Sequence, residues 1–364
     1  VSEAARWFGL MGMVWAIMQF IFSPVIGVLS DRFGRRPILL LSNFGLGLDY
    51  ILMALAPTLS WLFVGRALSG ITAASISTAN AYIADVTPPE KRAASYGLMG
   101  AAFGLGFVIG PALGGLLGDV DARLPFWVAA GLSLSNAAYG YFILPESLPP
   151  DKRTKHFNWR GARPWGAFSF LRSHPNLYGL CSMYALNQMA HYVLPSTAVL
   201  YLGYRYAWGP FEVGLALAGV GVFSALVQGW LIRIVVRKLG ERRMLLWGLM
   251  MGVIGFAGYG FAPQWQWFLV FMPIMSLWGL ANPALQSLMT QRIPSSKQGQ
   301  LQGTNGSLFG VVGIIAPVMF TQTFAFFTDK THSVIVPGAA MYLSALLCVI
   351  ALVWAWHKAH PIPS

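Results

Sequence analysis

The feature that most constrains this chain is a succession of about eleven apolar stretches, each close to the roughly 20 residues that a helix needs to cross a bilayer core. They lie roughly at residues 5–29, 38–56, 60–85, 95–118, 124–144, 175–202, 210–235, 244–262, 266–290, 299–327 and 337–357. Only 10% of the residues are charged, against about 25% in typical soluble domains. The sequence therefore predicts an all-α polytopic membrane protein with little chain left for a soluble domain.

One long polar connection, from Pro145 to Ser173, separates five predicted spans from six. We therefore expect an N-terminal half at residues 1–145, a central loop at 146–173 and a C-terminal half at 174–364. Basic residues mark cytoplasmic loops. They gather in alternate loops, at Arg32, Arg35, Arg36, Lys91, Arg92, the central loop, Arg237, Lys238, Arg242, Arg243, Arg292, Lys297 and Lys358. This pattern predicts a cytoplasmic central loop and a cytoplasmic C-terminus.

The two halves carry an internal repeat with an offset of about 206 residues. The matched landmarks are Gly34-Arg35-Arg36 with Gly240-Glu241-Arg242, Pro88 with Pro294, Gly97 with Gly303, and Pro111 with Pro317. A constant offset indicates two duplicated halves, as in many secondary transporters. The counterpart of the span that begins near Pro175 falls before residue 1, so we expect that a first helix is missing. A natural protein of eleven spans is the alternative.

A glycine- and arginine-rich turn follows the first span. It contains the candidate gating residues Gly27, Asp31, Arg32, Gly34, Arg35 and Arg36. Gly34 permits a tight bend, and Asp31 can pair with Arg35 or with the start of a neighbouring helix, where the dipole favours an anion. Asp85, at the inner end of its span, is expected to pair at a helix end or between helices. The simpler interpretation of the turn is an anchor for membrane topology.

A second glycine-rich motif lies in the span at 95–118, preceded by Gly100 and Gly104. It consists of Gly106, Gly110, Pro111, Gly114 and Gly115. Glycines spaced by four residues clear one helix face for close backbone approach, and the proline favours a kink. The pattern resembles the antiporter motif of drug-exporting major facilitators, and ordinary tight helix packing is the alternative.

Two charges lie inside the predicted membrane region. Asp49 and Arg66 each fall about six or seven residues from the outer ends of their spans, at a similar depth of roughly 9–11 Å, where they can pair. A lone charge in the middle of a membrane costs at least about 2.5 kcal/mol and usually serves function. We expect Asp49 to carry protons with Arg66 beside it; a static structural pair is the alternative.

Uncharged polar residues also recur in the spans. The candidates for a substrate cavity are Gln19, Asn80, His191, Gln228, Asn282 and Gln286. A cavity for an amphipathic molecule needs a few such groups among aromatic side chains. Each of them taken singly is equally expected in a hydrogen bond between helices.

Several classes of protein are disfavoured by these patterns. The net charge of +12 resides in short loops without a basic face interleaved with aromatics, so we expect no nucleic-acid partner. No His, Cys, Asp and Glu grouping has the spacing of metal ligands or of a catalytic set, so neither a metal site nor an enzyme is expected. An importer or uniporter of a metabolite remains the nearest rival, and a non-transporting scaffold is the next.

The chain resembles the tetracycline/proton antiporters of Gram-negative bacteria, which have the major facilitator fold. The resemblance extends over both halves and rests on Met18-Gln19, Ile21-Phe22, Ser30 to Pro37, Leu48-Asp49-Tyr50, Gly65-Arg66, Ser69 to Thr72, Phe103 to Gly106, Pro283 to Gln286 and Gln298 to Gly303. It implies two six-helix halves with the first transmembrane helix absent, and a monomer in the inner membrane. It also implies export of a drug in exchange for protons, with a divalent cation carried with the substrate and no other cofactor. Asp49, Arg66, Gln19 and Gln228 match family positions.

Two positions depart from that family. Gly252 stands where the resistance proteins have an aspartate, and Ser224 stands where they have a histidine. A tetracycline chelate with residual positive charge gains from carboxylates where water is scarce. We therefore expect neutral or weakly cationic amphipathic compounds to be exported better than the chelate. We also expect Gly252→Asp to raise tetracycline export, provided that the surrounding cavity is otherwise like that of the family.

Overall fold

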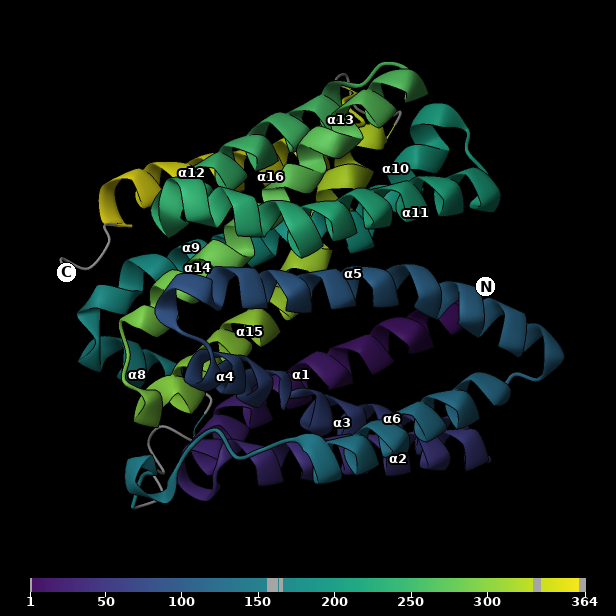
Figure 1. Cartoon of the computed structure of the whole chain (residues 1–364). Helices are drawn as coiled ribbons and strands as arrows, with labels where there is room; N and C mark the ends of the chain where they lie inside the picture. The colour runs from purple at the N-terminus through teal and green to yellow at the C-terminus, as the bar shows by residue number, and fades with distance from the viewer. Residues whose placement is uncertain (1, 156–162, 164–165, 330–334, 360–364) are drawn as a thin grey trace. The chain divides into compact units, whose positions relative to one another are not determined.

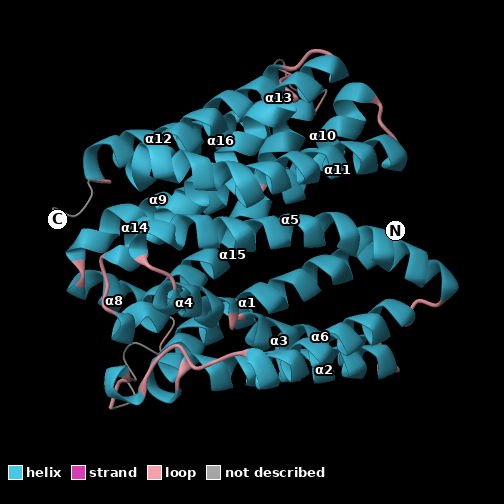
Figure 2. Cartoon of the chain, viewed as in Figure 1, coloured by secondary structure: helices cyan, strands magenta, loops and turns pink. Residues whose placement is uncertain are grey.

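The computed structural model describes residues 2–155, 163, 166–329 and 335–359, and all its regular elements in this part of the chain are helical (Figures 1 and 2). The first half contains α1 (Ser2–Phe33), α2 (Arg35–Leu55), α3 (Leu59–Ala73), α4 (Ile76–Val86), α5 (Pro89–Val120), α6 (Leu124–Ile143) and the short η1 (Pro150–Lys152). The remainder contains α8 (Gly166–Ser173), α9 (Pro175–His191), α10 (Val193–Tyr206), α11 (Pro210–Leu226), η2 (Val227–Leu231), α12 (Ile232–Phe261), α13 (Trp265–Leu277), η3 (Trp278–Leu280), α14 (Ala281–Gln291), η4 (Ser295–Lys297), α15 (Gln298–Thr328) and α16 (Ala339–Lys358).

Each predicted span coincides with one helix or with consecutive helical pieces. The pairs α3–α4 and α9–α10 are spans broken near their middle, and α13, η3 and α14 together form another. Seven described stretches are long and apolar enough to cross a membrane. One of these, Glu212–Phe261, has 50 residues and contains two predicted spans, because Gly240 turns the chain at φ 73° and ψ 168°.

One compact unit consists of Val1–Pro88, Gly110–Pro175 and Ile293–Ile314; we call it unit 1. Within it α2 packs against α3 and α6, and α1 packs against α3. The segment Ile293–Ile314, which brings the first half of α15, comes from far along the sequence. Unit 1 therefore does not end at residue 145, where the sequence repeat places the boundary between the halves. The division into two duplicated halves stays a prediction about the sequence.

The other compact unit, unit 2, consists of Pro89–Ile109, Asn176–Arg292 and Ile315–Ser364. Here α12 packs against α13, α14 and α16, and α11 packs against α13. The first half of α5 joins this unit through Gly97, where an added Cβ would lie 2.8 Å from the carbonyl oxygen of Gln228 and 2.7 Å from Ile232 Cδ1. A residue without a side chain is required there, because the backbones of α5 and η2 approach closely.

Glycines also explain how α15 packs against α1 inside unit 1, because they have no side chain to separate the two helices. Gly299 and Gly303 meet α1 with essentially no space for a Cβ, against Gly27 and Pro24 respectively. Gly306 and Gly310 continue the contact to Ser23 and Phe20, two turns further along. Small residues at such an interface allow two helix backbones to touch, which is how helices associate in lipid.

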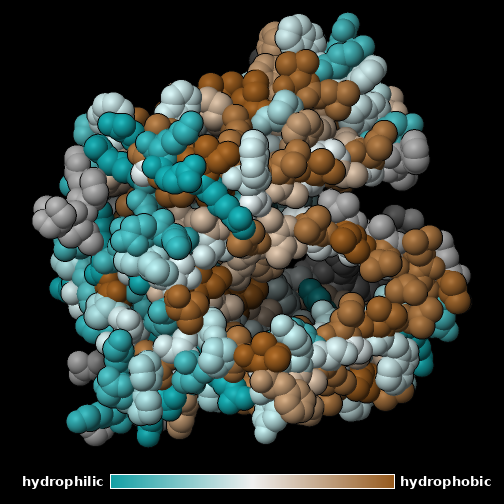
Figure 3. Space-filling view, in the orientation of Figure 1, coloured by the Kyte–Doolittle hydropathy of each residue, from teal (hydrophilic) through white to brown (hydrophobic). Residues whose placement is uncertain are grey.

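The surface agrees with a protein immersed in lipid along its helices. Large apolar side chains lie exposed on many spans, including Leu116, Phe142, Leu215 and Val318. On the face shown in Figure 3, hydrophilic side chains gather at the ends of helices, whereas hydrophobic side chains cover helix flanks. This distribution is the reverse of that on a soluble protein and fits a multi-pass membrane protein.

Candidate functional site: a charged turn and a buried carboxylate

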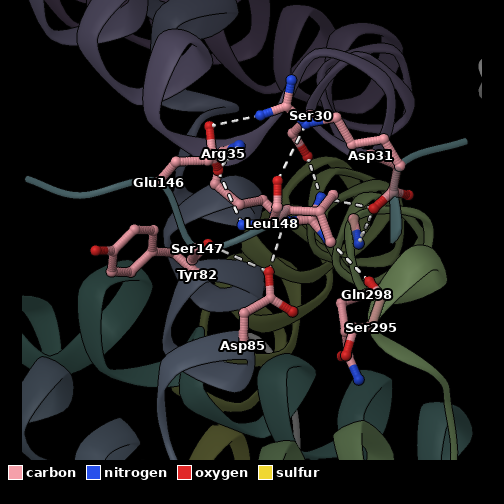
Figure 4. Close-up of polar contacts among 12 residues, drawn as sticks. Ser30, Asp31, Arg35, Tyr82, Asp85, Glu146, Ser147, Leu148, Ser295 and Gln298 are labelled. Carbon is pink, nitrogen blue, oxygen red and sulfur yellow. Dashed lines mark hydrogen bonds and ion pairs between the residues drawn. The ribbon is translucent and has the colours of Figure 1, made fainter. Parts of the chain in front are cut away.

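The turn between α1 and α2 is the most densely bonded polar region in the described part of unit 1 (Figure 4). Gly34 adopts φ 101° and ψ 163°, a conformation that is open essentially only to glycine. The bend brings Arg35, at the start of α2, back against Asp31, in the last turn of α1. Both side chains are fully buried, so this turn is more than an exposed topology anchor.

Arg35 connects three helices through its guanidinium group. Its Nη1 lies 2.6 Å from Asp31 Oδ1, and its Nε lies 3.0 Å from Asp85 Oδ2, at the end of α4. Its Nη2 also donates to the carbonyl oxygen of Ser295 at 3.1 Å, in the turn before α15. The expected inter-helix role of Asp85 is thus observed. Removing one partner from such a buried pair typically costs about 3–5 kcal/mol, because a charge is left uncompensated.

The carboxylate of Asp31 also binds the beginning of α15. Its Oδ1 accepts the backbone N–H of Gly299, and its Oδ2 accepts that of Gln300, each at 2.9 Å. The first N–H groups of a helix have no partner inside the helix and carry partial positive charge. A single side chain therefore makes both contacts that the sequence offered as alternatives, to Arg35 and to a helix start.

Glu146 completes this turn and was missed in the sequence. It lies just beyond α6, and its Oε1 accepts the backbone N–H of Arg35 at 2.9 Å and that of Leu148 at 3.0 Å. Its Oε2 lies 3.4 Å from Arg153 Nη2. The only available signal was an acid shortly after a predicted span, beside the basic loop.

The other predicted arginines of the motif are nearer the surface. Arg32 is exposed, and its guanidinium lies 5.2 Å from the Phe33 ring centre. Arg36 donates to the carbonyl oxygen of Tyr141 at 2.6 Å and stacks on that ring at 5.6 Å. These two residues bind neighbouring aromatic groups and take no part in the buried cluster.

Asp49 is the second candidate site. It lies in α2, is only 2% exposed, and neither carboxylate oxygen has a hydrogen-bond partner among the described residues. Arg66 lies in α3 and forms no ion pair with Asp49 within 4.0 Å in the described structure, so a direct contact is not observed and the role of Arg66 beside Asp49 stays a prediction. Gly65, one residue earlier, faces Asp49: a Cβ there would lie 3.2 Å from Asp49 Oδ1.

The glycines of the predicted antiporter motif do not show the close packing expected of them. Among the described residues, no atom lies within 4 Å of a Cβ added at Gly106, Gly110 or Gly114, and the side chain of Pro111 and the surroundings of Gly115 lie outside what the structure describes. Close approach occurs earlier in α5, where an added Cβ on Gly100 would collide with Gln228. The motif's role in antiport stays a prediction.

The predicted cavity residues fall into two groups. Gln19 and Asn80 belong to unit 1, while His191, Gln228, Asn282 and Gln286 belong to unit 2. Gln19 and Gln286 are buried, whereas His191 and Asn282 are exposed. Gln228 lies in the π-helical turn η2, a kind of irregularity that is frequent at functional sites, with its amide between Gly100 and Gly279.

Gly252 lies under the indole of Trp278. A Cβ at this position would lie 2.5 Å from Trp278 Cδ1 and 3.1 Å from its Nε1. Gly252→Asp is expected to raise tetracycline export only if the surrounding cavity is otherwise like that of the family. Here the ring of Trp278 already occupies the space beside position 252, so the effect of this substitution stays a prediction.

Comparisons with known proteins agree with this fold and these motifs. The family model of the Major Facilitator Superfamily matches residues 2–317 and again 180–363. The tetracycline resistance protein of class C from Escherichia coli is 35% identical over 98% of this chain and 90% of that protein. The class G protein from Vibrio anguillarum is 36% identical over 95% of this chain and 88% of that protein.

A solved structure shows the same fold at lower sequence identity. The crystal structure of the human organic anion transporter MFSD10 superposes with a TM-score of 0.85, at 22% identity, over 95% of this chain and 83% of that one. The chain therefore belongs to the major facilitator superfamily, within the family of the tetracycline resistance proteins. It is a proton-coupled, multi-pass drug efflux transporter.

Proposed function

We propose that this transporter exports small amphipathic compounds in exchange for protons that are carried by Asp49. The observation that carries this proposal is the carboxylate of Asp49, buried inside a span without a hydrogen-bond partner among the described residues. An ionisable group in that setting is costly and typically lies on a proton or ion pathway. A purely structural carboxylate would have its oxygens bonded, as those of Asp31 are.

The charged turn supplies the second part of the mechanism. Asp31 and Arg35 hold the start of α15 against the end of α1 through an ion pair and two backbone hydrogen bonds. Such contacts are discrete and can break together, which gives a two-state element that binding of substrate and proton can bias. We assign to this cluster the role of stabilising one of the states of the transport cycle.

The setting of the protein follows from its family and its charges. We propose a bacterial inner membrane with the C-terminus in the cytoplasm, because the loops rich in Lys and Arg and Lys358 then share one side. The partners are the substrate, protons and lipid, and the working form is a monomer. A divalent cation takes part only when it travels bound to the substrate, and the protein acts as a carrier without catalysing a covalent reaction.

The test is transport by Asp49→Asn in membrane vesicles with an imposed proton gradient. We expect efflux against a concentration gradient to be abolished, while exchange of substrate down its own gradient continues, because the substitution removes only the titrating group. Asp121→Asn is the matched control, since Asp121 is exposed at the end of α5. Full gradient-driven efflux by Asp49→Asn would refute the proton-carrying role.

A further inference from the structure

An aromatic and polar cluster lies in unit 2 where η3 interrupts the span made by α13 and α14. Trp278, the first residue of η3, is 7% exposed, and its Nε1 donates to Asn187 Oδ1 of α9 at 2.8 Å. The ring of Phe256 meets it edge-on at 5.1 Å between centres. These contacts fix the indole in one orientation, because both its polar atom and its faces are occupied.

A row of glycines on α12 lets the indole lie directly on the helix backbone. Gly252 faces Trp278, Gly255 faces Met275, and Gly248 faces Ala281, each with too little space for a Cβ. Trp278 thus occupies the place into which a longer residue at position 252 would point. The indole packs directly against the backbone of α12 at Gly252, so its position is fixed. We call this face of Trp278 the wall of the site.

Two polar side chains beside this wall are open. His191, at the end of α9, stacks on Trp278 with 5.7 Å between ring centres and 29° between planes, yet it is exposed. Asn282, the second residue of α14, is also exposed and follows Trp278 by four residues in the sequence. Polar groups inside a span seldom face lipid, so exposed ones border a space that holds water or substrate.

The charge of this region is equally informative. The acidic residues of unit 2 all lie at helix ends or in turns, at Glu90, Glu212, Glu241 and Asp329. Within unit 2, no carboxylate in the middle of a span is therefore available to a cationic chelate. An imidazole face, backed by an indole and flanked by an amide, instead suits an uncharged planar ring with a hydrogen-bonding group.

We propose that His191 and Asn282, backed by Trp278, form a subsite for an uncharged planar ring of the transported compound. Trp278 sets this preference, because it holds the imidazole in place and fills the space beside Gly252. The inference rests on the proposed export function and specifies which compounds this site accepts.

The first experiment measures saturable binding and proton-driven efflux of two probes, the neutral planar dye Nile red and magnesium-bound tetracycline. The unmodified protein is expected to take Nile red with the lower KM. Because a stacked aromatic contact and its buried area are lost, His191→Ala and Trp278→Ala should each raise the KM for Nile red about five- to tenfold, with little change in the maximal rate. Trp247→Ala is the matched control, since Trp247 lies exposed on α12 and should leave the KM unchanged.

The second experiment tests whether substitutions can shift the substrate preference from Nile red to magnesium-bound tetracycline. Gly252→Asp alone should not improve export of magnesium-bound tetracycline, because its Cβ collides with Trp278. Gly252→Asp combined with Trp278→Ala frees that space and should lower the KM for the chelate while raising that for Nile red. Trp278→Val keeps an apolar side chain but has no ring, and it replaces Trp278→Ala where that variant does not fold.

Distinct outcomes separate this inference from the proposed function. Loss of proton-driven efflux for both probes in the unmodified protein would refute the export function itself. Efflux with a KM for Nile red that is unaltered in His191→Ala and in Trp278→Ala (or Trp278→Val) would overturn the subsite alone. So would an absence of saturable Nile red binding, a lower KM for the chelate in the unmodified protein, or equal chelate export by Gly252→Asp with and without Trp278→Ala.

Discussion

Two turns of this molecule, one in each unit, occupy equivalent places in the sequence repeat but are held by different chemistry. Gly34 in unit 1 and Gly240 in unit 2 both adopt a backbone with positive φ, at 101° and 73°. The offset of about 206 residues also equates Arg35 with Glu241 and Asp85 with Gln291. The bend has been kept in both copies, whereas the charges around it have not.

The bonds around the two turns run in parallel. In unit 1, Arg35 binds Asp85 and the carbonyl oxygen of Ser295. In unit 2, Gln291 Nε2 donates to Glu241 Oε1 at 3.2 Å and to the carbonyl oxygen of Pro89 at 3.4 Å; Pro89 is the equivalent of Ser295. A buried network of ion pairs thus has a counterpart with a single charge and longer hydrogen bonds.

The start of the neighbouring helix explains why the two turns differ in strength. Asp31 is buried and accepts two N–H groups from the beginning of α15, where an anion is favoured by up to about 2 kcal/mol. Its equivalent is Arg237, which is exposed and has the wrong charge for a helix start. The comparison teaches that the bend of the backbone does not require the charged contacts that surround it in unit 1. The second turn has the bend but lacks a carboxylate bound to a helix start.

The largest effect is expected on removing the buried charges of the first turn. Asp31→Asn or Arg35→Met should lower the free energy of unfolding by about 3–5 kcal/mol. The first removes one of the two carboxylates that pair with the buried Arg35, and the second leaves Asp31 and Asp85 without their cation. Glu241→Gln should cost only about 1 kcal/mol, since it weakens hydrogen bonds alone. Unfolding in detergent, followed by circular dichroism, measures both. Arg32→Gln, at an exposed position, is the control, and equal losses in the two turns would contradict the asymmetry.

The glycines of the two turns give a second, smaller contrast. Gly34→Ala and Gly240→Ala should each cost about 1–3 kcal/mol, because alanine resists these backbone angles. Gly34→Ala should cost more, since its Cβ would also collide with the carboxylate of Glu146, whereas Gly240 has open space around it. The same unfolding assay ranks the two variants. An equal or larger loss of stability in Gly240→Ala would show that the collision with Glu146 does not add to the cost of Gly34→Ala.

The smallest effect comes from transferring the charged pair into the second turn. Glu241→Arg and Gln291→Asp should each destabilise alone, while the double variant should recover part of the loss, with a coupling of about 1 kcal/mol. The physical reason is that the side chains of positions 241 and 291 already lie within hydrogen-bond distance, 3.2 Å apart. The double-mutant cycle measures this coupling directly. Strict additivity would mean that the second turn cannot accommodate the pair.

The fold was largely accessible from the sequence, and the site only in part. The spacing of Asp31 and Arg35, four residues apart on either side of a glycine, indicated their contact. The two charges at similar depth indicated a site at Asp49, but the described structure shows no direct contact with Arg66, and Gly65 of α3 lies against the carboxylate. Glu146 and Trp278 gave no usable signal, since an acid in a loop and an aromatic residue in a span are both common.

The sequence by itself determined the class of protein, the succession of spans and the duplicated turns. It could do so because length, apolar composition and repeat offset are one-dimensional properties, and a bilayer accepts few structures besides helices. Tertiary structure alone decided which helix ends meet. The first half of α15 lies with α1 because glycines and one carboxylate match across nearly 270 residues of chain. It also decided that an indole fills the space over Gly252, because a side chain's neighbours in a bundle depend on helix rotation and approach, which no local pattern encodes.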